Sequence, residues 1–439
     1  MESINPSNGI LLSEFAEHNN QEVVDIVDAV YADWKKWKVT PFGFRKDLML
    51  KAANILRDKK TDLARIITLE MGKPISESLA EVEKSALVCD YYAEQAEKML
   101  SDEIMASDAS KSFISFEPLG VVLAVMPWNF HFWQVFRFAA PALMAGNAGV
   151  LKHASNVQGC AAAIENVFKE AGFPENLFRN LVIKSSQVDA VIKNPKIKAC
   201  TLTGSEFAGS HVAKTSGKEL KKVVLELGGA DAFIVLKDAN LEKAAKFAAQ
   251  SRMLNNGQSC IAAKRFIIDQ SILEEFLKLI NFELDKLKIG NPLQEGIHVG
   301  PLARADLREE IHAQVLSTIE QGASLLRGGK FIEGEGYFYE PTIVTDLKPN
   351  MKLYYEESFG PVFSVFTFET EEEAIQIAND SEFGLGGSLW TNDLIKGEKL
   401  ARQIESGGIF INGMTKSDPR LPFGGIKKSG YGRELSHYG

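Results

Sequence analysis

Three side chains in this sequence could together perform chemistry on a carbonyl carbon. Cys260 supplies a thiol, which as a thiolate attacks such a carbon. Glu226 lies in an apolar run just before Gly228-Gly229, and burial would raise the pKa of its carboxyl and suit it to act as a base. Asn129 follows Met126-Pro-Trp and offers an amide donor to an oxyanion. Each signal is weak alone, because a buried carboxylate can be purely structural and asparagine after a strand is often a turn residue.

A second group of residues has the types that bind phosphate or ribose. The segment from Thr203-Gly204-Ser205 to Gly209 joins an apolar run to a helical pattern, and the start of a helix binds phosphate through its free N–H groups. An ordinary turn explains this segment equally well, because the full GxGxxG fingerprint is absent. Lys152 ends another apolar run, where open α/β sheets bind ligands, although a lysine there can also be a solvated charge.

The thiol lies at a predicted junction between a helix and a strand. A helical pattern over 241–253 runs into the turn-forming Asn255-Asn256-Gly257, and the strand-like Phe266-Ile-Ile268 follows. Backbone N–H groups lack partners at such a junction and can turn toward a reacting atom. The local sequence therefore predicts a presented thiol with a donor beside it.

Strand-like runs alternate with helical patterns over most of the chain after Gly120. The expected strands of the first round are 121–125, 149–151, 181–183, 199–203 and 223–227. A second round begins at 232–236 and continues to Phe410, with expected helices at 271–287, 303–321, 371–379 and 394–404. This alternation predicts two α/β domains with parallel sheets covered on both faces, and a ligand cleft between them.

The first hundred residues differ from the rest because only helical spacing is evident in them. Between 101 and 118 a polar stretch ends in the alternating Phe113-Ile-Ser-Phe-Glu, which predicts a projecting hairpin. Such an arm could pair with another subunit.

Composition excludes several classes of protein. The chain has 439 residues, 45% hydrophobic and 24% charged, with a formal charge of −9, which argues against non-specific nucleic-acid binding. No apolar run approaches the roughly 20 residues of a membrane span, and the start lacks the features of a leader, so a cytoplasmic protein is expected. The four cysteines are widely spaced, with no CxxC pair, so neither a metal site nor a disulfide framework is expected.

The motifs in their order along the chain strongly resemble the NAD(P)-dependent aldehyde dehydrogenase superfamily, and most resemble its bacterial succinate-semialdehyde dehydrogenases. The segments that carry the resemblance are Pro127-Trp-Asn-Phe130, Thr203-Gly-Ser205, Glu226-Leu-Gly-Gly229, Gly257-Gln-Ser-Cys260, Glu357-Ser-Phe-Gly-Pro361, Pro422-Phe-Gly-Gly425 and Ser429-Gly-Tyr-Gly-Arg433. The resemblance spans nearly the whole chain. It implies an α/β fold with a Rossmann-type cofactor-binding domain, an α/β catalytic domain and a small β oligomerisation arm.

The resemblance also implies domain boundaries. The NAD(P)-binding domain would comprise 1–100 and 119–228, the arm 101–118 and the catalytic domain 229–411, while 412–439 would return to border the substrate mouth. Relatives carry a further strand-containing tail after the position of Gly439, which joins the arm in a sheet shared between subunits. A homodimer or homotetramer is expected where the full chain includes that tail.

In catalysis, the resemblance makes Cys260 the nucleophile that attacks the aldehyde and passes through a thiohemiacetal and a thioester. Asn129 and the Cys260 backbone N–H would hold the oxyanion, and one such donor typically contributes about 3 kcal/mol. Glu226 would activate the water that hydrolyses the thioester and assist deprotonation of the thiol. A carboxylic acid would be released.

For the cofactor, the resemblance implies NAD or NADP bound by residues from both domains. Lys152 would contact the adenosine ribose, Ser205 and Trp128 the pyrophosphate, Glu357 the nicotinamide ribose and Phe359 the nicotinamide. The neighbouring cofactor-site positions are Gly204, Gly209, Leu227 and Ser155. Relatives that require NAD often carry glutamate where this chain has Ser155, so NADP becomes admissible here.

The substrate assignment also rests on the resemblance. Arg137 matches an arginine that grips the substrate carboxylate in succinate-semialdehyde dehydrogenases, and Trp133, Ser417 and Arg420 would border the same mouth. At the position of another arginine of those relatives, this chain has Leu254. Glutarate semialdehyde and other small neutral or hydroxy aldehydes therefore remain alternatives.

Two points concern histidine. His131 replaces a proline of the family directly after Pro127-Trp-Asn-Phe130; it could loosen the turn that holds Asn129 or simply pack in the mouth. A non-redox cysteine hydrolase is the remaining alternative, but it would need a histidine base near Cys260 and the sequence shows no such signature.

Overall fold

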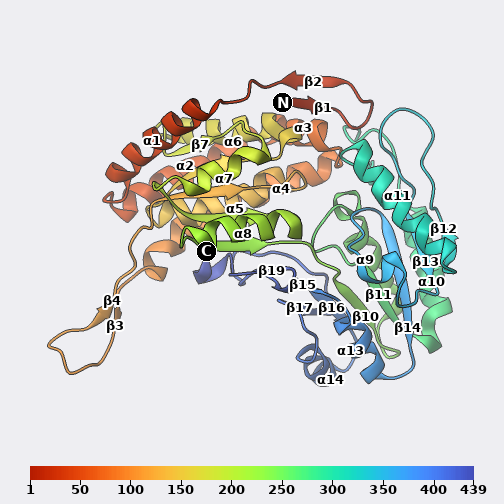
Figure 1. The fold of residues 1–439 in the computed structure, drawn as a ribbon. Helices are drawn as coiled ribbons and strands as arrows, with labels where there is room; N and C mark the ends of the chain where they lie inside the picture. The colour runs from red at the N-terminus through yellow and green to blue at the C-terminus, as the bar shows by residue number, and fades with distance from the viewer.

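A six-stranded sheet organises the first part of the chain. The computed structural model describes residues 1–439 (Figure 1), and it orders this sheet β19-β9-β8-β5-β6-β7. Its parallel strands are β5 (Val121–Val125), β6 (Ala148–Lys152), β7 (Phe178–Asn180), β8 (Ile197–Thr203) and β9 (Lys222–Glu226). The chain runs outward from β5 to β7 and then returns to the other side of β5 at β8. The strand order therefore reverses at β5, and open α/β sheets bind ligands at such a switch point.

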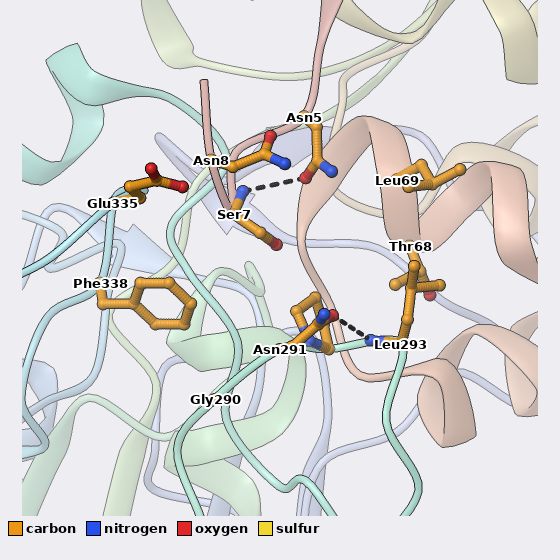
Figure 2. A pocket seen from close by; sticks show the side chains of 11 residues that line it. Asn5, Ser7, Asn8, Thr68, Leu69, Gly290, Asn291, Leu293, Glu335 and Phe338 are labelled. Atoms are coloured by element: carbon orange, nitrogen blue, oxygen red, sulfur yellow. Dashed lines mark hydrogen bonds between the residues drawn. The ribbon is translucent and has the colours of Figure 1, made fainter. Parts of the chain in front are cut away.

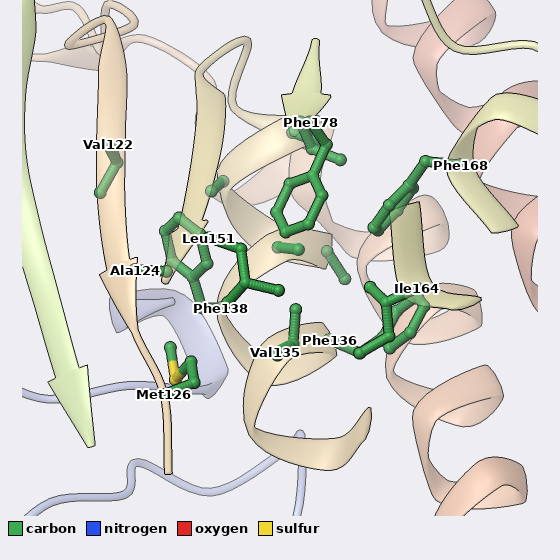
Figure 3. Packing of buried hydrophobic residues seen from close by; sticks show 14 of the residues in the cluster. Val122, Ala124, Met126, Val135, Phe136, Phe138, Leu151, Ile164, Phe168 and Phe178 are labelled. Atoms are coloured by element: carbon green, nitrogen blue, oxygen red, sulfur yellow. The ribbon is translucent and has the colours of Figure 1, made fainter. Parts of the chain in front are cut away.

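The strand β5 reads Val-Val-Leu-Ala-Val without alternation because helices cover both faces of the sheet. On one face, α5 (His131–Met144) and α6 (Gln158–Ala171) pack through aromatic rings (Figure 3). The ring centroid of Phe168 lies 5.2 Å from that of Phe136 and 4.9 Å from that of Phe178. Burying each such ring contributes about 1.5–3 kcal/mol, so this layer fixes α5 on the sheet.

The remaining helices of this half share the same hydrophobic core. They are α1 (Asn20–Trp37), α2 (Phe42–Asp58), α3 (Lys60–Met71), α4 (Ile75–Met99), α7 (Val188–Lys193) and α8 (Glu206–Lys218). Their ends follow local sequence rules: Asn19 and Glu22 form a capping box at the start of α1, and Gly72, with a φ of 88°, ends α3. Helix α4 packs along α5, which brings a face of α4 close to the residues that follow β5.

A second sheet organises the other half, with the order β12-β13-β14-β11-β10-β16-β17. Its strands are β10 (Ala232–Val235), β11 (Arg265–Asp269), β12 (Ser324–Arg327), β13 (Thr342–Thr345), β14 (Val362–Phe368), β16 (Gly387–Trp390) and β17 (Ile409–Ile411). Ile234 belongs to the core on one face, whereas Phe233 and Val235 belong to the core on the other. The alternation along β10 shows that both faces of this sheet are covered.

The helices of the second half are α9 (Leu241–Met253), α10 (Leu273–Asp285), α11 (Ala305–Glu320), α12 (Lys352–Tyr355), α13 (Glu371–Asn379) and α14 (Leu394–Ala401). Figure 1 shows them on both sides of the second sheet, with the first sheet and its helices forming a separate lobe.

Two segments leave this two-lobed plan. After β17 the chain returns to the first lobe, where β18 (Ile426–Lys427) pairs with β15 (Phe383–Gly384) and β19 (Gly430–Tyr431) pairs with β9. A hairpin of β3 (Glu103–Ile104) and β4 (Phe113–Ile114) projects away from the body (Figure 1). Its apolar side chains, including Phe116, are exposed.

The sequence predictions for the elements are confirmed in most places and wrong in two. The predicted strand 121–125 and helix 371–379 coincide with β5 and α13. The predicted strand 181–183 is wrong: β7 lies at Phe178–Asn180, because Leu181 and Ile183 are buried but the ladder partners of β6 are the three residues before them. The amino-terminal hairpin of β1 (Glu2–Ile4) and β2 (Leu11–Glu14) was not predicted, since only helical spacing is evident there.

None of the helices is both long and apolar enough to cross a membrane. No cluster of three or more His, Cys, Asp or Glu side chains is arranged to hold a metal ion.

Candidate active site

The loop that carries Cys260 is shaped by residues with positive φ. After α9, the short turn Leu254–Gly257 contains Asn255 and Asn256, both with a φ of 57°, a conformation that asparagine tolerates better than most residues. Gly257 has a φ of 80°, and a Cβ there would collide with the backbone of Gly360. Cys260 follows in a turn before β11, so the predicted presentation between a helix and a strand is confirmed.

Two cavities meet at this loop, and Cys260 and Gln134 line both of them. The larger, here called the outer cleft, has a volume of about 730 Å³ and lies where β5, β6 and β8 end, facing residues 304–314 and 355–359 of the other lobe. The smaller, here called the inner cavity, has a volume of about 190 Å³ and lies among α4, α5 and residues 414–417. The thiol can therefore meet a ligand from either side.

Asn129 is fixed beside the thiol loop from several directions. Its Nδ2 donates to the carbonyl of Gln258 at 3.1 Å, and its Oδ1 accepts from Nε2 of Gln134 at 3.2 Å. The backbone carbonyl of Asn129 accepts from Nδ2 of Asn255 and Nζ of Lys73, each at 2.9 Å. Because Gln134 donates to Oδ1, the other end of the Asn129 amide, Nδ2, must be the donor. One N–H of Nδ2 binds Gln258, and the second remains for another acceptor.

His131, which replaces the proline of the resembled family, packs inside the protein. It is fully buried, both ring nitrogens lack partners, and its ring centroid lies 6.1 Å from that of His153. Burial lowers the pKa of His131 well below its usual value, so the ring is neutral. The bonds from Lys73 and Asn255 hold the Asn129 carbonyl without a proline.

The Cys260 thiol is protonated in the free protein. Burial raises its pKa to about 12, although the charges of Lys264 and Arg137 act in the opposite direction. The Cys260 carbonyl accepts from Nζ of Lys264 at 2.7 Å, whereas its N–H donates to no protein atom. A nucleophilic role therefore requires a base, and the free N–H provides a donor beside the sulfur.

Glu226 is buried, but it lines neither cavity. Only 2% of its surface is exposed and both carboxyl oxygens lack hydrogen-bond partners. Burial, and next the charge of Glu434, raise the pKa of Glu226 above its usual range, while Arg137 and Arg433 act against this. A Cβ at Gly424 would lie 2.8 Å from Oε1 of Glu226. In this conformation the carboxyl lies beside Gly424 and faces neither cavity, and no hydrogen bond has to break for it to rotate.

The outer cleft has the donors that a dinucleotide requires. Helix α8 begins there, with Oγ of Ser205 capping the N–H of Ala208 at 3.3 Å, and Gly204 precedes it, so N–H groups at the helix start face the cleft. Lys152, at the end of β6, lines the cleft and forms no ion pair; burial lowers its pKa. Leu227 supplies an apolar part of the wall. This donor set fits phosphate and ribose.

The far end of the outer cleft is fixed by Glu357 and two aromatic rings. Oε1 of Glu357 accepts from the N–H of Gly229 at 3.0 Å and forms an ion pair with Nζ of Lys264, also at 3.0 Å. The rings of Trp128 and Phe359 meet edge to face at 5.6 Å. The structure thus brings the three predicted residues Trp128, Glu357 and Phe359 together on one wall.

Two residues predicted for this cleft do not line it. Ser155 is exposed, just beyond Ala154, which does line the cleft. Gly209 lies inside α8, and a Cβ there would lie 2.5 Å from Cδ2 of Leu227. The glycine lets the helix approach the end of β9, which is a packing role, and its assignment to cofactor binding stays a prediction. The sequence missed Ser185 and Arg304, which line the cleft from loops without a motif.

The inner cavity contains Trp133, Arg137 and Ser417, as predicted. Nε of Arg137 lies 2.6 Å from Oε2 of Glu434, and its Nη2 donates to Thr203 at 3.2 Å. The charge of Arg137 is therefore already compensated, which the sequence did not indicate.

Lys84, on α4, also lines the inner cavity and was missed. The only signal that could have identified it is its helical spacing from Ala80 and Glu81, which face the same cavity.

Arg420 does not reach the inner cavity, and its assignment to substrate binding is corrected. Its side chain is 75% exposed and pairs with Asp418 at 2.7 Å. Because Asp418 is only two residues before Arg420, the guanidinium folds back onto this carboxylate, away from the cavity.

A third hollow, of about 500 Å³, lies apart from the thiol between the amino-terminal hairpin, α3 and the loop around Asn291 (Figure 2). The amides of Asn5 and Asn291 accept from the nearby N–H groups of Ser7 and Leu293, each at 3.0 Å. It brings no nucleophile or cation together, so the chemistry lies at the thiol.

Comparisons with known proteins agree with this geometry. Residues 1–439 match the family model described as "Aldehyde dehydrogenase family". The chain is 51% identical over 437 residues to a probable succinate-semialdehyde dehydrogenase [NADP(+)] of Synechocystis sp., covering 100% of this chain and 96% of the relative. It is 44% identical over 437 residues to a succinate semialdehyde dehydrogenase [NAD(P)+] of Escherichia coli, covering 100% and 95%.

Among solved structures, a succinic semialdehyde dehydrogenase from Streptococcus pyogenes in complex with NADP+ superposes with a TM-score of 0.98. Its sequence is 38% identical, and the match covers 100% of this chain and 96% of that one.

Proposed function

The chain belongs to the aldehyde dehydrogenase family, and we propose that it oxidises succinate semialdehyde to succinate with NADP or NAD. The observation that carries this proposal is the position of Cys260 where the outer cleft meets the inner cavity. The relatives named for this substrate and for NADP support the assignment.

In the proposed reaction, the aldehyde enters through the inner cavity and its carbonyl carbon meets the Cys260 sulfur. The free N–H of Nδ2 of Asn129 and the unpartnered N–H of Cys260 receive the oxygen as it gains charge. Because Gln134 and Gln258 hold the amide in place, this donor needs no reorganisation during the reaction. The bound dinucleotide supplies a hydride acceptor.

Glu226 serves as the base in this proposal. Its raised pKa suits it to take a proton from the thiol or from a water near neutral pH. To do so its carboxyl must swing from Gly424 toward the thiol loop, and the absence of hydrogen bonds to either oxygen makes that rotation cheap. Cys260, Asn129 and Glu226 are thus the proposed catalytic residues.

For the dinucleotide, we assign Ser205 and Trp128 to the pyrophosphate, Lys152 to the adenosine ribose and Glu357 to the other ribose. All four line the outer cleft. Ser155, although exposed, follows Ala154 at its edge and places no negative charge there. This arrangement supports acceptance of the additional phosphate of NADP.

We also infer that the projecting hairpin of β3 and β4 pairs with a second copy of the chain. It exposes a row of apolar side chains, and Ile104 is 73% exposed. Replacing Ile104 and Phe113 with lysine should lower the molar mass measured by light scattering. An unchanged oligomeric state would contradict this role for the hairpin.

The experiment that tests the proposed function mixes the protein with succinate semialdehyde and NADP or NAD, and follows absorbance of the reduced cofactor. Glutarate semialdehyde and neutral aldehydes of similar length test the substrate alternatives. Formation of succinate together with reduced cofactor is expected. Absence of reduced cofactor with every aldehyde would overturn the assignment.

A further inference from the structure

Most charged side chains that line the inner cavity already have a partner. Glu81 lies 2.5 Å from Nζ of Lys73 and accepts from the N–H groups of Phe132 and Trp133. Glu77 accepts from the N–H of Asn255 at 2.8 Å. Neither carboxylate therefore forms an ion pair with Lys84, and Glu81 acts on it only from a distance.

The positively charged side chains of the cavity differ in whether they have an ion-pair partner. Arg137 is paired with Glu434, and the nearby Asp418 is paired with Arg420. Lys416 lines the rim with an exposed side chain, which water can solvate. Lys84 alone is partly buried and forms no ion pair. Lys84 is therefore the one partly buried cation of the cavity that has no carboxylate within ion-pair distance.

The ammonium of Lys84 is nevertheless held in one place. Its Nζ donates to Oγ of Ser417 at 2.9 Å and lies 3.9 Å from the ring centroid of Trp133. An ammonium has three N–H donors, so two remain for a ligand after the bond to Ser417. The Ser417 hydroxyl can turn its own proton toward the same ligand.

We propose that Lys84, together with Ser417, binds the terminal carboxylate of the substrate and makes this enzyme selective for short aldehydes that end in a carboxylate. This inference rests on the proposed function and deepens it. Arg137, which the sequence resemblance favoured for this role, adds positive potential to the wall of the cavity, with its Nε beside Glu434 and its Nη2 donating to Thr203. Lys84 is a residue that determines specificity, because it contacts the end of the substrate that does not react.

The proposal has a pH consequence. Burial, and next the charge of Arg137, lower the pKa of Lys84 to about 7, while Glu81, Asp418 and Cys260 act in the opposite direction. Lys84 is charged below this pKa and neutral above it, so the preference for an acidic aldehyde over a neutral one should weaken as the pH rises through about 7. Glu77 also faces the cavity, and burial raises its pKa to about 7, so its ionisation weakens the preference over the same range.

The test compares succinate semialdehyde with butanal in the parent and in Lys84→Met, which keeps an unbranched apolar side chain over Trp133. The measured quantity is the ratio of kcat/KM for the two aldehydes, because effects on Cys260, Glu226 or folding that act on both substrates cancel in it. We expect the ratio to fall about 100-fold, as for the loss of a charge-assisted hydrogen bond in a water-poor site. The control is Lys98→Met, which removes the same charge from an exposed position of α4 and should leave the ratio unchanged.

Two further variants separate a binding role from a structural one. Lys84→Arg should restore most of the ratio and leave only the shallower decline that the ionisation of Glu77 causes, because guanidinium stays charged. Ser417→Ala should lower the ratio about tenfold or less, because it removes one neutral donor.

A measurement without turnover completes the test: succinate should slow alkylation of Cys260 by iodoacetamide in the parent but not in Lys84→Met.

An unchanged ratio in Lys84→Met, or a larger loss in Lys416→Met, would overturn the inference while leaving the aldehyde dehydrogenase assignment intact. A parent protein that reduces no cofactor with any aldehyde would instead refute the proposed function. The two failures are therefore distinguishable.

Discussion

The outer cleft and the inner cavity meet at one sulfur but are built in different ways. The outer cleft, of about 730 Å³, uses strand ends, the start of α8 and the N–H of Gly229 holding Glu357. The inner cavity, of about 190 Å³, uses long side chains on two helices and a loop. Backbone donors suit a ligand that every relative shares, whereas side chains on helix faces can change without altering the fold. In the proposed function, the outer cleft holds the dinucleotide and the inner cavity selects the aldehyde.

The largest predicted effect on kcat comes from removing the Cys260 sulfur, at which the two cavities meet. Cys260→Ala should lower kcat for aldehyde oxidation by at least about 10⁴-fold, as expected for loss of a nucleophile. The affinity for NADP, measured by quenching of tryptophan fluorescence, should change less than about threefold, because the sulfur is one of many groups in the outer cleft.

The matched control for this variant is Cys200→Ala, which removes a buried thiol on β8 that lines neither cavity. It should retain kcat and lose about 1 kcal/mol of stability. Oxidation activity that survives in Cys260→Ala would remove the sulfur from the mechanism.

The next effect concerns Glu226, which belongs to neither cavity. Glu226→Gln keeps the shape but removes the base, and kcat should fall about 10²–10⁴-fold. Because burial raises the pKa of Glu226, its basic form appears only as pH rises; kcat of the parent should therefore increase through that pKa, and the variant should lose this limb of the profile. Identical pH profiles in the two proteins would assign the base to another group.

A smaller effect should be confined to the outer cleft. Ser155→Glu places a carboxylate beside the cleft edge, where it repels the extra phosphate of NADP, and the ratio of kcat/KM for NADP over NAD should fall about 10- to 100-fold. The KM for succinate semialdehyde, measured at saturating NAD, should not change. A parallel change in both parameters would contradict the separation of the two cavities. The control is Ser185→Ala, which changes another serine of the outer cleft without adding a charge and should not lower the ratio for NADP over NAD in this way.

The sequence predicts the outer cleft better than the inner cavity for a physical reason. The cleft depends on turns after strands, and Thr203-Gly-Ser205 and Glu226-Leu-Gly-Gly229 mark such turns locally. Most residues predicted there line it, as Trp128 and Glu357 do. Ser155, which is exposed beyond Ala154, and Gly209 are the exceptions. A glycine that permits a close packing contact, as Gly209 does, and one that approaches a ligand look alike in sequence.

The inner cavity depends on contacts between segments far apart in the chain. Ser417 is hydrogen-bonded by Lys84, 333 residues earlier, and no local pattern indicates that pair. Arg137 was predicted from resemblance, but its partner Glu434 becomes apparent only when the return segment beyond β17 packs against the first sheet. The same packing leaves Arg420 outside, paired with Asp418. Which charges are paired thus depends on tertiary contacts. The sequence therefore placed Arg420 at the substrate mouth, whereas the structure pairs it with Asp418 outside the inner cavity.

The central claim is that the Cys260 sulfur bonds to an aldehyde from one cavity while the cofactor occupies the other. The most direct measurement mixes the protein with succinate semialdehyde and NADP, quenches the mixture with acid during turnover and maps the modified peptide by mass spectrometry. A succinyl group on the peptide that contains Cys260, formed only when NADP is present, is the predicted result. A modification that forms without NADP, or one that lies on Cys89, Cys160 or Cys200, would contradict the account.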